Sequence, residues 1–398
     1  MANRYDYVIV GGGLAGASAV QGIREIDTKG SILLIGNEKH LPYDRPPLSK
    51  KLWFGQKKIE EIFLHDPDYY KNHSVTLALS TRASSIDPKN RTVTAGTETY
   101  GYGRLLLATG GVPKRLKVPG GDLDGISYYR YLDDYLKVRA SAAEGMRAVI
   151  IGGGFIGSEL AAALNRNKVA VTMVYPSPYL VDRVFPEGLG RALQSHYVER
   201  GIRILSGVKP ASFTKKGRRF VTKTDSGAEI ESDSVIVGAG IIPSVELAEG
   251  AGLKTGNGVE VNGLLQTSEA DIYAAGDIAF FPYAALQKST RIEHWDNSLN
   301  QGALAGRNMA GANEEFTYMP YFFSDLFDFG YEAVGEVDSA METFADWQKE
   351  NDTGVIYYLK DKVVRGVMMC NVWDKVPAAR ELIKRKVRFD GKNLRGAL

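Results

Sequence analysis

The feature that most constrains this chain is a glycine-rich loop that occurs twice, each time directly after an apolar run. The first copy lies in Tyr7–Gly16 and reads YVIVGGGLAG, and the second lies in Ala148–Gly157 and reads AVIIGGGFIG. Both have the spacing G-x-G-x-x-G between an expected strand and an expected helix, which is typical of dinucleotide-binding folds. One such match is only moderate evidence, but two copies with the same spacing in one chain are not a coincidence. We therefore predict two bound dinucleotides.

Each glycine of such a loop has its own task. We expect Gly11 to make the tight turn, Gly13 to let a pyrophosphate approach the bare backbone, and Gly16 to bring the helix close to the strand. The phosphates then meet the free N–H groups and the positive end of the helix dipole. Helices are predicted at Leu14–Ile26 and Phe155–Asn165. The two predicted phosphate sites comprise Gly11, Gly13, Leu14, Ala15, Gly16 and Gly152, Gly153, Gly154, Phe155, Ile156, Gly157.

The composition restricts the function classes. A chain of 398 residues predicts two or three domains, and 44% apolar with 24% charged residues is typical of a soluble globular enzyme. The 49 basic and 47 acidic residues give a net charge of +2, so we expect no nucleic-acid partner. No apolar run approaches the roughly 18 residues of a spanning helix. The beginning MANRYDYVIV leads almost directly into the first strand, so we expect no leader and a cytoplasmic location.

Cysteine usage excludes several chemistries. Cys370 is the only cysteine of the chain, so an internal disulfide, a Cys-x-x-Cys redox pair and a thiolate metal cluster cannot form. We interpret Cys370, within an apolar run, as a small buried side chain. No metal site is predicted.

The residues after each second strand bear on the nucleotide that is bound. In the first unit Glu38, with Asn37 beside it, lies where a carboxylate usually reads the ribose hydroxyls, and we favour Glu38. In the second unit this place holds Ser177, which neither accepts both NAD ribose hydroxyls nor repels the extra phosphate of NADP. Arg183 on the next loop either neutralises a 2′-phosphate or is an ordinary solvated charge. We therefore expect NADPH to be accepted without excluding NADH.

A proline-rich loop follows the first unit's second strand. Leu41–Trp53 reads LPYDRPPLSKKLW, and its prolines forbid a regular helix. It is either a solvated surface loop or a cap over a cofactor, with Arg45 gripping a phosphate and Lys50 supplying a point charge.

Several segments resemble one group of flavoproteins. LPYDRPPLSK, IIGGGFIGSEL at Ile150–Leu160, Glu293–Asp296 and GYEAVGEVDS at Gly330–Ser339 are similar to segments of apoptosis-inducing factor and of bacterial ferredoxin and rubredoxin reductases. These proteins belong to the pyridine nucleotide-disulfide oxidoreductase superfamily, and this chain lacks the redox disulfide of other members. The C-terminal part resembles apoptosis-inducing factor more than the ferredoxin reductases. The resemblance implies FAD as the first cofactor and NAD(P)H as the second.

The predicted fold is therefore α/β, with two Rossmann-like dinucleotide-binding domains, the second inserted into the first, and a C-terminal α+β domain. The FAD-binding domain is expected at residues 1–112 and 241–316, the NAD(P)H-binding domain at 113–240 and the C-terminal domain at 317–398.

The resemblance also implies roles for individual residues. Lys50 would lie near the flavin edge and pair with Glu159, Phe155 would gate the flavin face, and His294 would line the flavin and nicotinamide together with Trp295. Phe323 stands where apoptosis-inducing factor has tryptophan. Without the resemblance, Glu159 would be an ordinary helix acid and Trp295 a core residue. Further predicted cofactor contacts are Ala83, Arg130, Asp277, Gly240, Glu332 and Asn371.

These observations predict an enzyme that takes hydride from NADH or NADPH onto FAD and passes electrons to an external acceptor. The acceptor is left open as an iron–sulfur protein, a quinone or oxygen. One alternative is a dedicated ferredoxin or rubredoxin reductase. Another is a redox-sensing interaction protein in which turnover is incidental and nucleotide binding changes an oligomer such as a homodimer.

Overall fold

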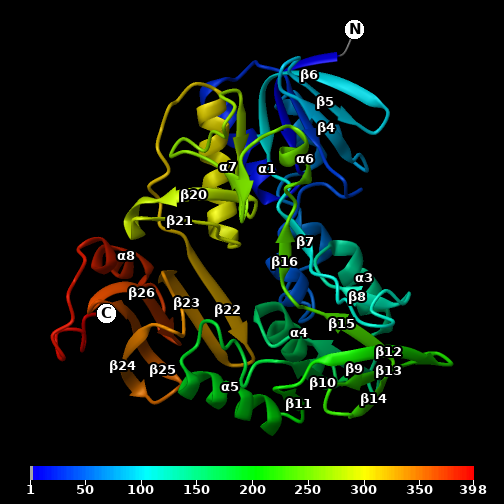
Figure 1. Cartoon of the computed structure of the whole chain (residues 1–398), viewed down its shortest axis with the longest axis vertical. Coiled ribbons are helices and arrows are strands. Elements are labelled where there is room, and N and C mark those ends of the chain that lie inside the picture. Colours follow the sequence, from blue (N-terminus) through cyan, green and yellow to red (C-terminus); the bar gives the residue numbers. More distant parts are fainter. Residues whose placement is uncertain (1–2) are drawn as a thin grey trace. The chain divides into compact units, whose positions relative to one another are not determined.

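A computed structural model describes residues 3–398 and divides the chain into two compact units (Figure 1). Met1 and Ala2, with which the predicted FAD-binding domain begins, lie outside the described residues. The first unit comprises Met1–Asp44, Ile59–Val112 and Ile242–Pro320, and the second comprises Arg45–Lys58, Pro113–Ile241 and Tyr321–Leu398. The division of the chain into three domains with the boundaries given above stays a prediction.

The first unit is built on a sheet with the strand order β3-β2-β1-β6-β5-β4, to which β19 adds by pairing with β6. Strands β1, β2, β3, β6 and β19 pair in parallel, whereas β4 and β5 pair antiparallel. The strands are β1 (Asn3–Val10), β2 (Ile32–Ile35), β3 (Val75–Ala78), β4 (Ala83–Asp87), β5 (Thr92–Ala95), β6 (Glu98–Leu107) and β19 (Ile272–Ala274).

Helices α1 (Leu14–Ile26) and α7 (Trp295–Met309) of this unit lie side by side (Figure 1). Their backbones touch through glycine, since a Cβ added to Gly22 would lie 1.9 Å from the carbonyl oxygen of Ala303. A Cβ at Gly302 would likewise lie 2.3 Å from the carbonyl oxygen of Ala15. The first glycine loop is therefore fixed by a helix from much later in the chain.

The remaining elements of the first unit are small. A four-stranded sheet has the order β17-β18-β20-β21, and the short helices lie between strands. The bounds are α2 (Pro67–Asn72), α6 (Glu246–Gly250), β17 (Thr255–Gly256), β18 (Gly258–Glu260), β20 (Ala279–Tyr283) and β21 (Lys288–Thr290). The chain passes between the units in the short strands β7 (Gly111–Pro113) and β16 (Ile241–Pro243).

The second unit repeats the parallel α/β pattern. Its five-stranded sheet has the order β11-β10-β9-β15-β8, and a three-stranded antiparallel sheet β12-β13-β14 packs against it through a common core. The elements are β8 (Ile126–Tyr128), α3 (Leu132–Ser141), β9 (Arg147–Ile151), α4 (Phe155–Arg166), β10 (Ala170–Tyr175), α5 (Glu187–Glu199), β11 (Arg203–Ser206), β12 (Pro210–Lys216), β13 (Arg219–Thr224), β14 (Glu229–Ser232) and β15 (Ser234–Val237).

The C-terminal part of the second unit is a five-stranded antiparallel sheet with the order β22-β23-β26-β25-β24. Its elements are β22 (Tyr321–Leu326), β23 (Phe329–Gly335), β24 (Glu342–Lys349), β25 (Thr353–Lys360), β26 (Val363–Cys370) and α8 (Val376–Lys384). Cys370 is fully buried in β26, in agreement with its predicted packing role.

The structure confirms the predicted fold class, with two dinucleotide-type sheets and a C-terminal antiparallel sheet with a helix. Helix α1 has the predicted bounds, and α4 extends one residue beyond the predicted Phe155–Asn165.

Candidate functional site: two glycine loops and a buried lysine–glutamate pair

The first glycine loop (Gly11–Gly16) connects β1 to α1 in the first unit. Gly11 has φ +131°, and a Cβ there would lie 2.1 Å from the carbonyl oxygen of Ala108. A Cβ at Gly16 would lie 2.0 Å from the carbonyl oxygen of Gly11, whereas a Cβ at Gly13 would meet no atom within 4 Å. Helix α1 has no side-chain cap at Gly13, so its N-terminal N–H groups are available for an anion. Of the three glycines, only the middle one has open space at the position of its Cβ. This space fits a bound pyrophosphate.

The second glycine loop (Gly152–Gly157) repeats this geometry between β9 and α4. Gly152 has φ +126°, and its added Cβ would lie 2.3 Å from the carbonyl oxygen of Gly238. At Gly157 the Cβ would lie 2.1 Å from the carbonyl oxygen of Gly152, and at Gly154 it would meet nothing within 4 Å. Gly153 packs on the ring of Tyr175, and Ile156 is 39% exposed. This loop therefore fits a second dinucleotide.

The predicted ribose-binding acid of the first unit lies at the carboxyl end of β2. The Tyr43 hydroxyl donates to Oε2 of Glu38 at 2.5 Å, which fixes the carboxylate, and Asn37 beside it is exposed. Ala83 is buried in β4 opposite Ala95. The pairing of Tyr43 with Glu38 was not foreseen from the sequence.

Asp277 follows β19 at the same edge of the sheet as the first glycine loop. Its Oδ1 accepts a hydrogen bond from the Ser298 hydroxyl at 3.2 Å, and its backbone oxygen accepts one from Arg291. A Cβ at Gly276 would lie 3.0 Å from the Cβ of Ala15. The next element of the chain after Asp277 is strand β20.

His294 and Trp295 lie at the start of α7, where His294 is the N-cap residue. Burial lowers the pKa of His294 to about 4, against the opposing effect of Asp277, so the imidazole is neutral at pH 7. The indole N–H of Trp295 donates to Oδ1 of Asp44 at 2.5 Å, which ties α7 to the beginning of the proline-rich loop.

In the second unit, Ser177 follows β10 and is half-buried, and Arg183 is exposed on the loop after it. The backbone oxygen of Arg183 accepts a hydrogen bond from the Ser339 N–H at 3.1 Å, so the backbone of this loop is anchored. The Arg183 side chain is exposed on the surface.

Lys50 and Glu159 form a buried ion pair, with Nζ of Lys50 2.9 Å from Oε1 of Glu159. Their exposed fractions are 7% and 6%. Glu159 lies in the second turn of α4, and η1 (Pro46–Ser49), the 3₁₀ turn before Lys50, contacts this helix. The Nζ of Lys50 also lies 4.8 Å from the centre of the Phe323 ring. The resemblance is what led to the pairing of these residues, and the structure brings them together.

Two serines that the sequence did not indicate complete this site. The Ser49 hydroxyl donates to Oε2 of Glu159 at 2.5 Å, and the Ser324 hydroxyl donates to Oε1 at 2.5 Å. Serine before a lysine and serine in an aromatic strand are ordinary, so no sequence signal distinguishes them.

The other predicted residues of the second unit have different surroundings. Phe155 packs on Phe322 with ring centres 5.7 Å apart. A guanidinium nitrogen of Arg45 donates to the backbone oxygen of Arg130 at 3.0 Å. Gly240 has φ +92° and open space around its Cβ position.

Glu332 lies in β23, and Asn371 directly follows the neighbouring strand β26. Burial raises the pKa of Glu332, and its Oε2 has no hydrogen-bond partner among residues 3–398. Such an oxygen is suited to accept a hydrogen bond from a ligand. Asn371, with φ +48°, accepts a hydrogen bond from the Gly330 N–H at 2.8 Å and donates to the Asp352 oxygen, so its amide is largely used within the protein.

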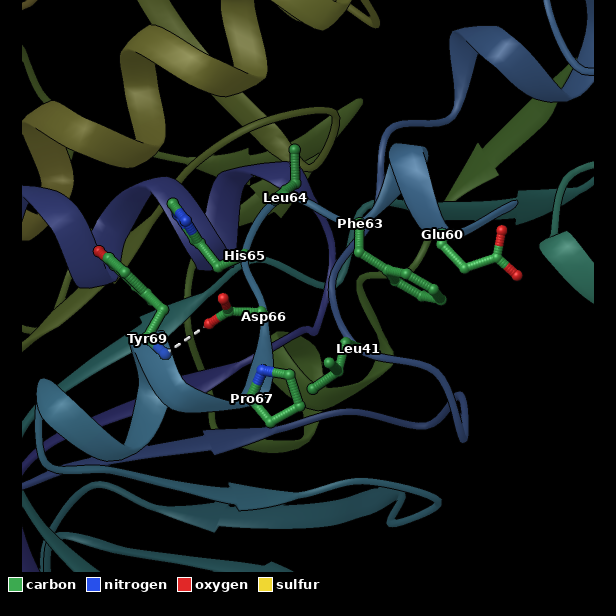
Figure 2. Close-up of a pocket in the computed structure, with 8 residues that line it drawn as sticks. All are labelled: Leu41, Glu60, Phe63, Leu64, His65, Asp66, Pro67 and Tyr69. Atoms are coloured by element: carbon green, nitrogen blue, oxygen red, sulfur yellow. Dashed lines mark hydrogen bonds between the residues drawn. The ribbon is translucent and has the colours of Figure 1, made fainter. Parts of the chain in front are cut away.

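A pocket of the first unit contains none of the predicted residues (Figure 2). In this pocket the ring of His65 stacks on the ring of Tyr69 with centres 3.6 Å apart, and burial lowers the pKa of His65. The lining residues are Leu41, Glu60, Phe63, Leu64, His65, Asp66, Pro67 and Tyr69.

Within residues 3–398 no group of histidine, cysteine and acidic side chains is arranged to hold a metal ion. Over the same range, no helix combines the length and the apolarity that a membrane crossing demands.

The comparisons with known proteins agree with this geometry. The model of the pyridine nucleotide-disulphide oxidoreductases matches residues 5–302. The model of the C-terminal domain of mitochondrion-associated apoptosis-inducing factor matches residues 305–353 and 345–385.

Similar proteins extend over nearly the whole chain. Apoptosis-inducing factor 1 of Dictyostelium discoideum is 31% identical, covering 99% of this chain and 81% of the relative. The ferredoxin–NAD(+) reductase component of the anthranilate 1,2-dioxygenase system of Burkholderia cepacia is 32% identical, covering 95% and 93%. The structure of putidaredoxin reductase in covalent complex with putidaredoxin has a TM-score of 0.90 and 29% identity, covering 98% of this chain and 94% of that chain. The chain thus belongs to the pyridine nucleotide-disulphide oxidoreductase family, and within it is a FAD-dependent NAD(P)H oxidoreductase with a C-terminal domain of the apoptosis-inducing factor type.

Proposed function

We propose that this oxidoreductase passes the electrons of NAD(P)H to a small acidic iron–sulfur protein of the ferredoxin type. The observation that carries the proposal is a charge asymmetry at the C-terminus. Beyond Asp374 only Glu381 and Asp390 are acidic, against eight basic residues, although the whole chain has a net charge of just +2. The basic residues are Lys375, Arg380, Lys384, Arg385, Lys386, Arg388, Lys392 and Arg395. The net charge of the whole chain does not reveal this asymmetry, because acidic residues elsewhere in the chain balance the basic C-terminus.

Most of this charge is available to a partner. All eight basic side chains except that of Arg380 are exposed, and Lys384 forms an ion pair with Glu381 at 3.1 Å. An acidic protein would gain both attraction at long range and charge-assisted contacts on this surface. The similar protein of Burkholderia is named a ferredoxin–NAD(+) reductase component. The structure of putidaredoxin reductase contains putidaredoxin as its ferredoxin-type partner.

A series of ring contacts leads from this basic segment to Lys50. The guanidinium of Arg380 in α8 lies 5.8 Å from the centre of the Tyr321 ring, and Tyr321 stacks on Phe323 at 6.0 Å. Phe323 in turn faces the ammonium group of Lys50. These contacts connect α8, on which the partner would dock, to Lys50 through two aromatic rings.

Each of the two glycine loops would hold one of the two dinucleotides. The first glycine loop, Glu38 and Asp277 would hold FAD, and the second glycine loop would hold NAD(P)H. The bound flavin supplies the hydride acceptor and the capacity to release electrons singly. The resemblance supports a Lys50 that would stabilise negative charge at the flavin edge. The neutral His294 would line the flavin without adding charge. Cys370 is buried, and burial raises its thiol pKa far above the ordinary value, so no thiol takes part.

Charge reversal tests the choice of acceptor. We expect the triple variant Lys384→Glu, Arg385→Glu, Lys386→Glu to lose roughly tenfold or more in kcat/KM for an acidic ferredoxin at low salt, with the difference shrinking as ionic strength rises. Anaerobic ferredoxin reduction, coupled to cytochrome c, measures it.

The matched control reverses three exposed basic residues of the β12–β13 hairpin, Lys215, Lys216 and Arg218. Both variants should retain the parent rate with a neutral quinone. Equal losses in the two variants, or an unimpaired α8 variant, would refute this docking surface. Fast turnover with oxygen or quinone and none with any ferredoxin would refute the acceptor.

We also propose that the enzyme accepts both NADPH and NADH, because Ser177 replaces the acid that would repel a 2′-phosphate. The cytoplasmic location, where NAD(P)H is available, and a homodimer are further proposals. Cell fractionation tests the first, and sedimentation with and without NADH tests the second together with any redox-sensing role.

A further inference from the structure

The carboxylate of Glu159 accepts hydrogen bonds from further donors besides its partner lysine. The carboxylate is buried in α4 and accepts bonds from Lys50, Ser49 and Ser324. The three donors come from two places in the chain, since Ser49 ends η1 and Lys50 follows it directly, whereas Ser324 lies in β22. Ser49 and Ser324 are each about 2% exposed or less, so water does not compete for these bonds.

The three donors are distributed unevenly over the two carboxylate oxygens of Glu159. Oε2 accepts from Ser49, while Oε1 accepts from both Lys50 and Ser324. The ammonium group has three N–H donors and directs one of them to Glu159. The centre of the Phe323 ring lies 4.8 Å from the ammonium nitrogen, and an aromatic ring attracts a cation without accepting a strong hydrogen bond.

The hydroxyls weaken the hold of the carboxylate on the lysine. In a buried site each donor stabilises part of the carboxylate charge, and removal of one leaves an oxygen that must find another partner. The ammonium group of Lys50 already lies at hydrogen-bond distance from Oε1. A carboxylate without its serines would therefore act on Lys50 with more of its negative charge and cancel more of the positive field of the ammonium group.

We infer that Ser49 and Ser324 are positioning residues that share the charge of Glu159, so that the Lys50 ammonium stays directed at the flavin and raises the reduction potential of the flavin. The inference rests on the proposal that Lys50 lies at the flavin edge. Loss of either hydroxyl makes the reduced flavin, which carries more negative charge, less stable relative to the oxidised form.

The test is the midpoint potential of the bound FAD, measured anaerobically against reference dyes. We expect Ser324→Ala and Ser49→Ala each to shift the two-electron equilibrium about tenfold towards oxidised flavin, which corresponds to about 30 mV. Ser324→Cys, which keeps the volume but is a weak donor, should behave like Ser324→Ala, whereas Ser324→Thr, which keeps the hydroxyl, should restore the parent potential.

Ser232→Ala is the matched control, because Ser232 is fully buried in β14 and its hydroxyl has no hydrogen-bond partner among the described residues. It should leave the potential unchanged. Flavin content and unfolding midpoints report whether each variant folds, and Ser324→Cys together with Ser49→Ala carries the test if Ser324→Ala does not.

Lys50→Met separates the two ways in which the inference could fail. If it leaves the potential unchanged, Lys50 does not act on the flavin and the underlying proposal is wrong. If it lowers the potential while Ser49→Ala and Ser324→Cys match the parent, the serines merely pack and the inference is overturned. Shifts in all three variants, with rescue by Ser324→Thr, would support it.

Discussion

At the scale of single residues, the glycines of one loop differ sharply in what they tolerate. Gly16 has no room for a side chain because the Gly11 oxygen lies 2.0 Å from the position of its Cβ, whereas the Cβ position of Gly13 is open. The protein itself therefore excludes a side chain at Gly16. At Gly13 only a bound ligand would exclude one.

We therefore expect Gly16→Ala to destabilise the fold by about 1–3 kcal/mol or more, as overpacking generally does. Gly13→Ala should change the free energy of unfolding of the flavin-free protein by less than about 1 kcal/mol, and should weaken FAD binding. Urea unfolding and flavin titration of both variants measure the two effects. An intact flavin affinity in Gly13→Ala would contradict the placement of the pyrophosphate there.

At the scale of elements, the end of β10 decides which nicotinamide nucleotide the second glycine loop accepts. Ser177 follows this strand at the place where an acid would receive the ribose hydroxyls. The strand and α4 fix the position, so a new side chain there acts on the nucleotide without rearranging the sheet.

Ser177→Glu should raise the ratio of kcat/KM for NADH to that for NADPH by roughly tenfold or more, because the carboxylate repels the 2′-phosphate. Steady-state kinetics with a ferredoxin or quinone acceptor measure this ratio. Arg183→Ala is the companion variant, and it should lower only the NADPH value if its guanidinium meets the phosphate. An unchanged ratio in Ser177→Glu would place the ribose elsewhere.

At the scale of the whole molecule, the neutral His294 couples global stability to pH. Its pKa falls from 6.5 to about 4 on folding, so between these values the unfolded chain binds a proton that the folded chain does not. This contribution to stability is therefore complete above pH 6.5 and is lost as the pH falls towards 4. The loss amounts to at most about 3 kcal/mol.

Urea unfolding at pH 7.5 and 4.5 should show this loss in the parent protein and a smaller one in His294→Gln, which cannot titrate. Other groups, His65 among them, contribute to the slope in both proteins, so the difference between the two isolates His294. Parallel pH profiles for parent and variant would show that His294 is protonated in the folded state.

The sequence by itself determined the features that depend on neighbouring residues. The glycine spacings predicted both phosphate loops, the bounds of α1, and with the apolar runs the parallel strands around them. Local backbone geometry and periodicity are properties of a few consecutive residues, so they can be read without the rest of the chain. The resemblance added the pair of Lys50 and Glu159.

Only the tertiary structure decided which distant residues surround that pair. The two serine partners of Glu159 are 110 and 165 positions away in sequence, and Trp295 meets Asp44 over 251 positions. Such contacts depend on the packing of strands and helices from separate parts of the chain, and serine or aspartate gives no local pattern that foretells its partner. The physical reason is that burial and hydrogen-bond pairing are set by long-range packing, whereas turns and helices are set by the residues next to one another.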